Sequence, residues 1–137
     1  MTNLTNICGW GRYPKQDAYL HTPSSCAALE LITKQQNSIL ARGMGRSYGD
    51  SANAPNVLQT MYINHFIEFD KVTGKLTAEA GITLREILEV IVPSGWFLPV
   101  TPGTSYVSLG GAIASDVHGK NHHCAGTFGQ HVKSLRI

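Results

Sequence analysis

The 137-residue sequence predicts a globular domain in which α-helices and β-strands are mixed. Its length is close to that of one domain, at roughly 100–200 residues each. Two segments place apolar residues at helical spacing directly after capping residues. Several short runs rich in Val, Ile, Leu and Phe have the composition of strands. Two glycine-rich segments follow such runs and have the composition of loops.

The N-terminal residues 1–20 are expected to form an irregular arm, in which Trp10 and Tyr13 cover the core. The alternative is that these aromatic side chains contact a ligand. Thr22 is expected to cap the first helix, with Pro23 at its first position. The helix would end near residue 37, and its apolar face would comprise Ala27, Ala28, Leu31 and Ile32.

Strands are expected in runs of apolar and β-branched residues, at 38–41, 57–60, 66–70, 75–80 and 132–137. The run at 66–70 and the run at 75–80 would form a hairpin that turns at 72–74. Residues 96–100 are expected to be a short strand or an extended run. The small residues in the middle of 101–119 predict a short helix, packed against either a flat ligand or a neighbouring backbone.

The second helix has the clearest local pattern. Thr83 and Glu86 have the spacing of a capping box. Apolar residues then follow at i, i+3, i+4 and i+7, namely Leu84, Ile87, Leu88 and Ile91. Pro93 and Gly95 are expected to end this helix.

The overall composition narrows the class of protein. The net charge of +2 and the scattered basic residues give no case for a nucleic-acid partner. Three scattered cysteines, Cys8, Cys26 and Cys124, argue against a disulfide framework and for a reducing, cytoplasmic location. No apolar run approaches the ~20 residues of a transmembrane helix, and no signal peptide is visible.

The most informative stretch is the glycine-rich loop Ala41–Asp50, which follows a short apolar run. Successive backbone N–H groups in such a loop can form a concave nest for an anion. Arg42 and Arg46 add permanent positive charge, so the loop predicts a phosphate or diphosphate site. The loop fits neither the dinucleotide-binding fingerprint nor the Walker loop. The alternative is a glycine-rich connection without a ligand.

A histidine cluster lies near the C-terminus, and His118 and His122 have the i, i+4 spacing of zinc ligands on a helix. Gly119 and Asn121 argue against a helix there, so no metal site is predicted. His118 could act as a general base, or could be a loop histidine bonded to backbone. Asp116 could be a helix-end cap or a catalytic carboxylate.

Four segments together resemble a known family: Ala41–Asp50, Pro102–Thr104, Leu109–Ala114 and His118–His123. They resemble the FAD-binding domain of the vanillyl-alcohol oxidase and p-cresol methylhydroxylase superfamily, most strongly its decaprenylphosphoryl-β-D-ribose 2′-oxidase branch. The resemblance implies an α+β domain of two small α/β subdomains, with FAD extended between them. Residues 21–137 would be its N-terminal part, truncated at the C-terminus, without the rest of the flavin domain and the substrate domain.

The resemblance also implies the site residues. The diphosphate would be bound through the backbone of Arg42, Gly43, Met44, Gly45, Arg46, Ser47 and Tyr48. The second wall of the site would comprise Pro102, Gly103, Thr104, Gly110, Gly111, Ala114 and Gly119. His118 would lie beside the flavin ring on the substrate side, as the candidate catalytic residue. Many relatives carry a first-loop histidine that bonds covalently to flavin. Arg46 stands there in this sequence, so FAD is expected to be non-covalent.

The function implied by the resemblance is that of an FAD-dependent oxidoreductase, which oxidises a sugar-type alcohol by hydride transfer to flavin. The alternatives are a sugar-lactone or alditol oxidase of the same superfamily, and a nucleotide-binding module without redox chemistry. The expected partners are a small sugar-type substrate and a missing C-terminal part of the same polypeptide. Residues 1–137 alone are expected to bind FAD weakly or not at all and to lack turnover.

Overall fold

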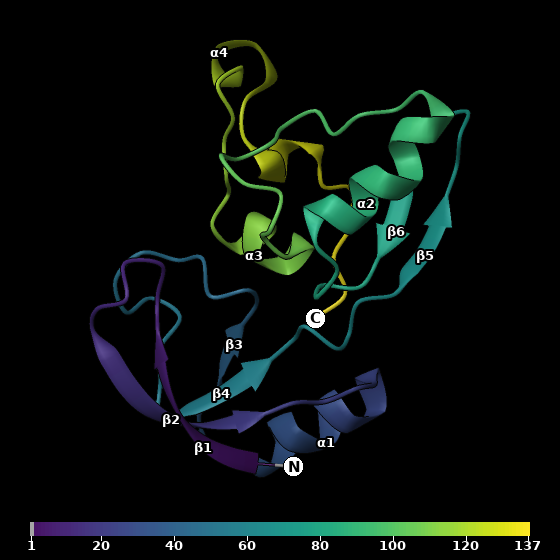
Figure 1. Cartoon of the computed structure of the whole chain (residues 1–137). Helices are drawn as coiled ribbons and strands as arrows, with labels where there is room; N and C mark the ends of the chain where they lie inside the picture. The colour runs from purple at the N-terminus through teal and green to yellow at the C-terminus, as the bar shows by residue number, and fades with distance from the viewer. Residues whose placement is uncertain (1) are drawn as a thin grey trace. The chain divides into compact units, whose positions relative to one another are not determined.

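The structure is a computed structural model that describes residues 2–137. The chain divides into two compact units, with the boundary between Asn64 and His65. Both units contain strands and helices (Figure 1). Unit 1 ends at Asn64 and unit 2 begins at His65, and each is described by itself.

Unit 1 is built on a four-stranded sheet with the order β1-β2-β4-β3 (Figure 1). The strands are β1 (Thr2–Cys8), β2 (Lys15–His21), β3 (Leu40–Arg42) and β4 (Asn56–Gln59). The β1–β2 pair is antiparallel, whereas β4 is parallel to both β2 and β3. Ile7, Ala18 and Val57 form the buried core of this unit.

The prediction that residues 1–20 form an irregular arm is wrong, because β1 and β2 form a hairpin within the sheet. Few apolar residues mark this hairpin: in β2 only Ala18 and His21 are buried. The hairpin is held by backbone hydrogen bonds between β1 and β2, which the pattern of apolar side chains does not reveal. Trp10 and Tyr13 are 54% and 81% exposed, so neither covers the core.

The first helix, α1 (Cys26–Gln35), begins later than predicted. Ser25, rather than Thr22, is the N-cap, and its hydroxyl accepts a hydrogen bond from the Ala28 amide at 3.2 Å. None of the ten residues of α1, all of which the structure describes, is buried. Leu31 is 61% exposed, so the predicted apolar face contributes no buried residue to the core.

The glycine-rich loop is part of the connection from β3 to β4. It begins at the carboxyl end of β3. The strand expected at 38–41 is found at Leu40–Arg42, where Leu40 and Arg42 are half-buried and Ala41 is exposed. Ligands of α/β sheets commonly bind beyond the carboxyl ends of strands. The strand expected at 57–60 is confirmed as β4, in which Val57 and Leu58 are buried.

Unit 2 begins with the predicted hairpin, β5 (Phe66–Phe69) and β6 (Leu76–Ala78), which pair antiparallel. The helix α2 (Leu84–Ile91) follows and buries Leu84, Ile87 and Ile91. Its predicted capping box is confirmed. The 3₁₀ turn η1 (Val92–Ser94) and the left-handed Gly95 end the helix, as expected.

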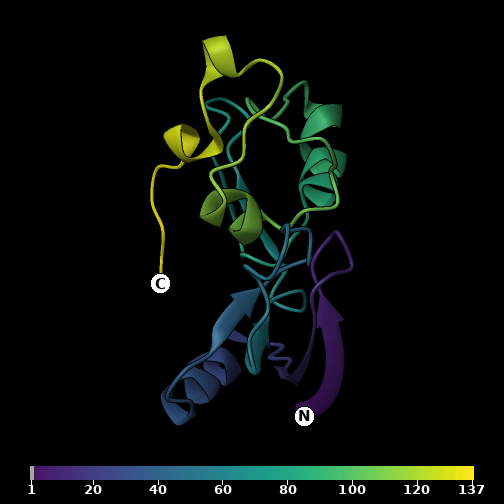
Figure 2. The ribbon, with the colours of Figure 1, turned by 90° about the vertical axis from the view of Figure 1, so that its left-hand side faces the viewer.

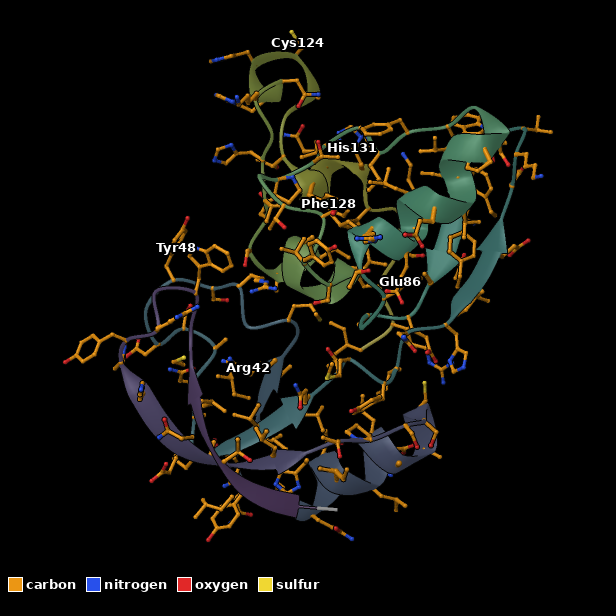
Figure 3. The ribbon with its side chains drawn as sticks, in the orientation of Figure 1. Arg42, Tyr48, Glu86, Cys124, Phe128 and His131 are labelled. Atoms are coloured by element: carbon orange, nitrogen blue, oxygen red, sulfur yellow. The ribbon has the colours of Figure 1, made fainter. Side chains whose placement is uncertain are left out.

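The rest of unit 2 contains three short elements: α3 (Leu109–Ala114), α4 (His122–Ala125) and η2 (Phe128–His131). Phe128 is 7% exposed and joins the core that α2 helps to form (Figure 3). The prediction of a short helix in 101–119 is confirmed by α3. Residues 96–100 form no strand in the described chain and are an extended run.

Two predictions in the C-terminal part are wrong. A helix was not expected after Gly119, but α4 forms a single turn there, starting after Asn121. The strand expected at 132–137 is absent from the described residues, and this segment runs on from η2 as extended chain (Figure 2). Its apolar residues have the composition of a strand, but the segment pairs with no neighbouring strand.

Within residues 2–137, none of the helices combines the length and the apolar character that crossing a bilayer requires.

Candidate functional site

The first loop presents a row of unused backbone donors. Within the described chain, six of its amides donate no hydrogen bond to a protein acceptor: Gly43, Met44, Gly45, Ser47, Tyr48 and Gly49. Gly45 and Gly49 have φ values of +65° and +59°, a region that glycine enters at little cost. Such amides are the donors from which anion-binding nests are made.

The tip of the β1–β2 hairpin packs against this loop. The Trp10 amide donates a hydrogen bond to the Ser47 carbonyl at 2.8 Å. A Cβ atom on Gly9 would lie 2.5 Å from the Gly49 carbonyl oxygen and 2.6 Å from that of Ser47. Gly9 is therefore required for close approach of two backbones, and the N-terminal hairpin is a structural part of the loop.

The two arginines of the loop have different surroundings. The Arg42 guanidinium donates hydrogen bonds inside unit 1, to the carbonyl oxygens of Cys8 and Ala52 and to the side chain of Asn53 (Figure 3). Burial lowers the pKa of Arg42. Arg46, in contrast, is exposed, and its guanidinium carbon lies 5.1 Å from the centroid of the Trp10 ring. This is within the range of a cation–π contact.

The glycines of the second predicted wall, in unit 2, also differ from one another. A Cβ on Gly110 would lie 2.9 Å from the Ala80 Cβ, and one on Gly119 would lie 2.8 Å from the Thr101 carbonyl oxygen. These two glycines serve protein packing. A Cβ on Gly103 would meet no described atom within 4 Å, and its φ lies outside the left-handed region. Neither packing nor backbone conformation explains glycine at 103.

Asp116 is a helix-end cap. It follows α3 with a φ of +42°, its amide donates to the Ile113 carbonyl, and the next amide, of Val117, donates to Ala112. This is the Schellman arrangement. The Asp116 carboxylate accepts a hydrogen bond from the Gly129 amide at 2.8 Å. Of the two interpretations left open by the sequence, the structure supports the cap.

His118 is exposed and begins a row of histidine rings. Its ring centroid lies 5.3 Å from that of His122, and His122 in turn lies 3.9 Å from His123. His122 is held by a contact between its Nδ1 and the Gly119 carbonyl at 3.2 Å. In the described residues no group of three or more His, Cys, Asp or Glu side chains has the arrangement of a metal site.

The predicted site residues fall into two groups. Residues 42–48 lie in unit 1, where they form one continuous loop, and residues 102–119 lie in unit 2. Sequence reasoning missed two supports of the first loop, Trp10 and Asn53. The aromatic, turn-rich stretch around Trp10 was a visible signal, whereas no pattern marked Asn53.

Comparison with known proteins gives the class of protein. A model of the FAD binding domain family matches residues 21–137. The chain belongs to this family, and FAD is its cofactor. The membership in the vanillyl-alcohol oxidase and p-cresol methylhydroxylase superfamily and the α+β fold of that type, both expected from the resemblance, are confirmed.

Individual relatives are more specific. The chain is 36% identical to decaprenylphosphoryl-β-D-ribose oxidase of Mycolicibacterium smegmatis over 143 residues, which cover 99% of the chain and 31% of the relative. It is 33% identical to L-gulonolactone oxidase of Scyliorhinus torazame over 91 residues, covering 66% of the chain and 21% of that relative. The chain thus spans about a third or less of the length of these relatives.

Solved structures share the fold. Cholesterol oxidase from Brevibacterium sterolicum superposes with a TM-score of 0.73 at 18% identity, over 87% of this chain and 25% of that one. An alkyldihydroxyacetonephosphate synthase superposes with a TM-score of 0.72 at 18% identity, over 85% of this chain and 24% of the other.

Proposed function

We propose that the protein functions in an FAD-dependent oxidoreductase that oxidises a sugar-type alcohol. The observation that carries the proposal is the loop of unused amides at 43–49, in a chain of the FAD-binding family. The similarity to decaprenylphosphoryl-β-D-ribose oxidase supports the substrate class. FAD supplies the acceptor for a hydride when it is bound.

The residues of the first loop fit a diphosphate. A doubly charged group binds to a backbone nest through several N–H donors. This loop offers six amides without protein acceptors, two glycines of positive φ that shape the nest, and an exposed arginine. We assign the diphosphate to the backbone of residues 42–48, with Arg46 as the exposed arginine of the loop.

In unit 2 we assign cofactor contacts to Pro102, Gly103, Thr104, Gly110, Gly111, Ala114, His118 and Gly119. Gly103 is the best supported, because the protein itself gives no reason for a glycine there. Within this set Gly103, Ala114 and His118 are exposed, and they are expected to contact the flavin end of the cofactor.

We propose that FAD is held without a covalent bond. The resemblance implies that Arg46 stands where a first-loop histidine would bond to the flavin, and a guanidinium that stays protonated is not a nucleophile. A cytoplasmic location is also proposed. It is supported by the scattered cysteines Cys8, Cys26 and Cys124, none of which forms a disulfide within the described residues.

His118 is the proposed catalytic residue. When an alcohol becomes a carbonyl, its carbon loses a hydride and its hydroxyl loses a proton. The exposed His118 ring makes no hydrogen bond to the described chain and is available to take that proton. His122 is less available, since its Nδ1 contacts the Gly119 carbonyl.

The test is His118→Ala in the flavin-loaded enzyme, followed by stopped-flow absorbance of flavin reduction. Loss of a general base slows such a step by about 10²–10⁴-fold, and the bound FAD content is expected to be unchanged. His123→Ala, a substitution in the same cluster, is the matched control and is expected to have little effect. Reduction by His118→Ala at the wild-type rate would remove His118 from the reaction.

A second candidate function is that of a sugar-lactone or alditol oxidase, which the similarity to L-gulonolactone oxidases favours. Oxygen consumption with a panel of sugar alcohols, lactones and phosphorylated sugars distinguishes the two substrate classes. A protein with no flavin absorbance and no reducible chromophore would support the remaining alternative, a nucleotide-binding module without redox chemistry.

A further inference from the structure

Arg42 lies at the junction of three segments that are distant in sequence. Its Nη2 donates to the Cys8 carbonyl oxygen at 2.7 Å, at the end of β1. Its Nη1 donates to the Ala52 carbonyl oxygen at 2.8 Å and to the Asn53 Oδ1 at 2.9 Å. One side chain thus joins the N-terminal hairpin, the end of β3 and the segment after the glycine loop.

The chemistry of this junction suits arginine in particular. A guanidinium has five N–H donors in a rigid plane, and three hydrogen bonds to oxygen atoms use three of them. Partial burial of this charge lowers the pKa of Arg42, and the cost is offset by the bonded oxygens. A lysine ammonium is a point charge on a flexible stem and cannot match this planar arrangement.

The guanidinium also lies directly beside the loop backbone. A Cβ atom built on Gly45 would overlap the Arg42 Nη2 atom. The Gly45 backbone therefore runs over the guanidinium, at a φ of +65°. Asn53 is itself held, since its Nδ2 lies 3.4 Å from the Pro14 carbonyl oxygen. The loop is thus supported on one side by groups whose positions are fixed by hydrogen bonds.

We propose that Arg42 is a positioning residue: its side chain fixes the open conformation of residues 43–49 and does not itself contact the diphosphate. The two arginines of the loop then have separate tasks, Arg42 in ordering the loop and Arg46 in meeting the ligand. The identity of the ligand, the FAD diphosphate, rests on the proposed function. The ordering of the loop by Arg42 does not, because it is a property of the protein without ligand.

The ordering role can be measured without FAD. In the ¹⁵N-labelled chain, order parameters of the amides at 43–49 report their motion on the ps–ns timescale. Arg42→Lys and Arg42→Gln are expected to lower these values from about 0.85 to below about 0.6, while the amides of unit 2 keep theirs. Arg46→Lys is the matched control on the same loop and is expected to leave the order parameters unchanged.

Binding is then measured on the same samples by titration with FAD and with inorganic pyrophosphate. Both Arg42 variants are expected to bind about tenfold more weakly or worse, because binding must then order a loop that is mobile in the free protein. If Arg42 variants fail to fold, Asn53→Ala removes a single acceptor and is expected to loosen the loop partially.

The outcomes separate the two proposals. Unchanged order parameters of residues 43–49 in the Arg42 variants and in Asn53→Ala would overturn the positioning role. If these variants also bound FAD more weakly, Arg42 would instead contact the diphosphate directly. A loosened loop in the Arg42 variants, in a flavin-loaded enzyme whose FAD binding is unchanged by them, would support the positioning of the loop by Arg42 and contradict the assignment of this loop to the diphosphate.

Discussion

Two glycines at the tip of the β1–β2 hairpin have opposite surroundings. Gly9 lies against the carbonyl oxygens of Ser47 and Gly49, whereas a Cβ on Gly11 would meet no described atom within 4 Å. Backbone oxygens cannot rotate away as the end of a side chain can. A methyl group at position 9 must therefore displace either the hairpin tip or the glycine-rich loop.

Gly9→Ala is accordingly expected to destabilise the protein by about 1–3 kcal/mol, the usual cost of overpacking. Gly11→Ala is the matched control. It is expected to be neutral or to stabilise slightly, because it restricts the unfolded chain without a clash. Urea denaturation of the two variants and the wild type measures the difference. Equal stabilities for the two variants would show that the tip does not pack against the loop.

Some residue-level features could be predicted from the sequence and others could not. That residues 43–49 form a glycine-rich loop was predictable, because glycine density is a local property of the sequence. The contact of Arg42 with Cys8 joins positions 34 residues apart, and no spacing rule reports such a pair. For the same reason the support given by Asn53 was missed.

The capping box of α2 shows how one element is specified by its own residues. The Glu86 carboxylate accepts hydrogen bonds from the Thr83 hydroxyl at 2.6 Å and from the Thr83 amide at 2.8 Å. The hydrogen bond from the Thr83 side chain is the larger cause that lowers the pKa of Glu86. The ionised carboxylate is therefore favoured in the folded helix.

This lowered pKa predicts a pH dependence. A carboxylate whose pKa is lower in the folded than in the unfolded state stabilises the fold above its unfolded pKa. That stabilisation is lost as the pH falls through the pKa of Glu86 in the folded state, which lies below the ordinary glutamate pKa of about 4.3. The thermal stability of wild type is thus expected to exceed that of Glu86→Gln at pH 7, and the gap to close at pH 3.

Thr83→Ala tests the same box from its other end and is expected to cost about 1 kcal/mol. Glu89→Gln, on the exposed face of the same helix, is the control and should change the melting temperature less. A wild-type advantage over Glu86→Gln that persists unchanged at pH 3 would contradict the role assigned to the carboxylate.

Elements whose interactions are local were predicted well, as α2 and the β5–β6 hairpin show. The β1–β2 hairpin was missed because β2 alternates weakly, with only Ala18 and His21 buried. Residues 132–137 were predicted as a strand on their apolar content. A strand also needs a hydrogen-bonding neighbour, which composition does not supply. The N-cap of α1 is Ser25 rather than the predicted Thr22, because several residues in this segment can cap a helix and the sequence does not distinguish between them.

At the scale of the whole molecule, the chain has two units and covers 31% of its relative from Mycolicibacterium smegmatis. We expect these 137 residues to bind FAD only weakly, with a Kd of about 1 mM, equivalent to about 4 kcal/mol. Anaerobic incubation with FAD and the sugar panel is expected to leave the flavin oxidised. Reduction of the flavin by the chain alone would contradict this expectation.

Non-covalent attachment is a separate prediction for the flavin-loaded enzyme. Mass spectrometry of the denatured protein is expected to give the mass of the polypeptide alone, with free FAD in the supernatant. The substitution Arg46→His tests whether the side chain at this position decides whether the flavin becomes covalently attached. A wild-type mass that includes the flavin would overturn the assignment.

The account depends most on the unused amides of the glycine-rich loop, and a titration of the ¹⁵N-labelled chain tests them directly. FAD is expected to shift the amide resonances of residues 43–49, and riboflavin, which lacks the diphosphate, is expected to leave them in place. Equal shifts with both compounds, or FAD-dependent shifts that omit residues 43–49, would contradict the assignment of this loop to the diphosphate.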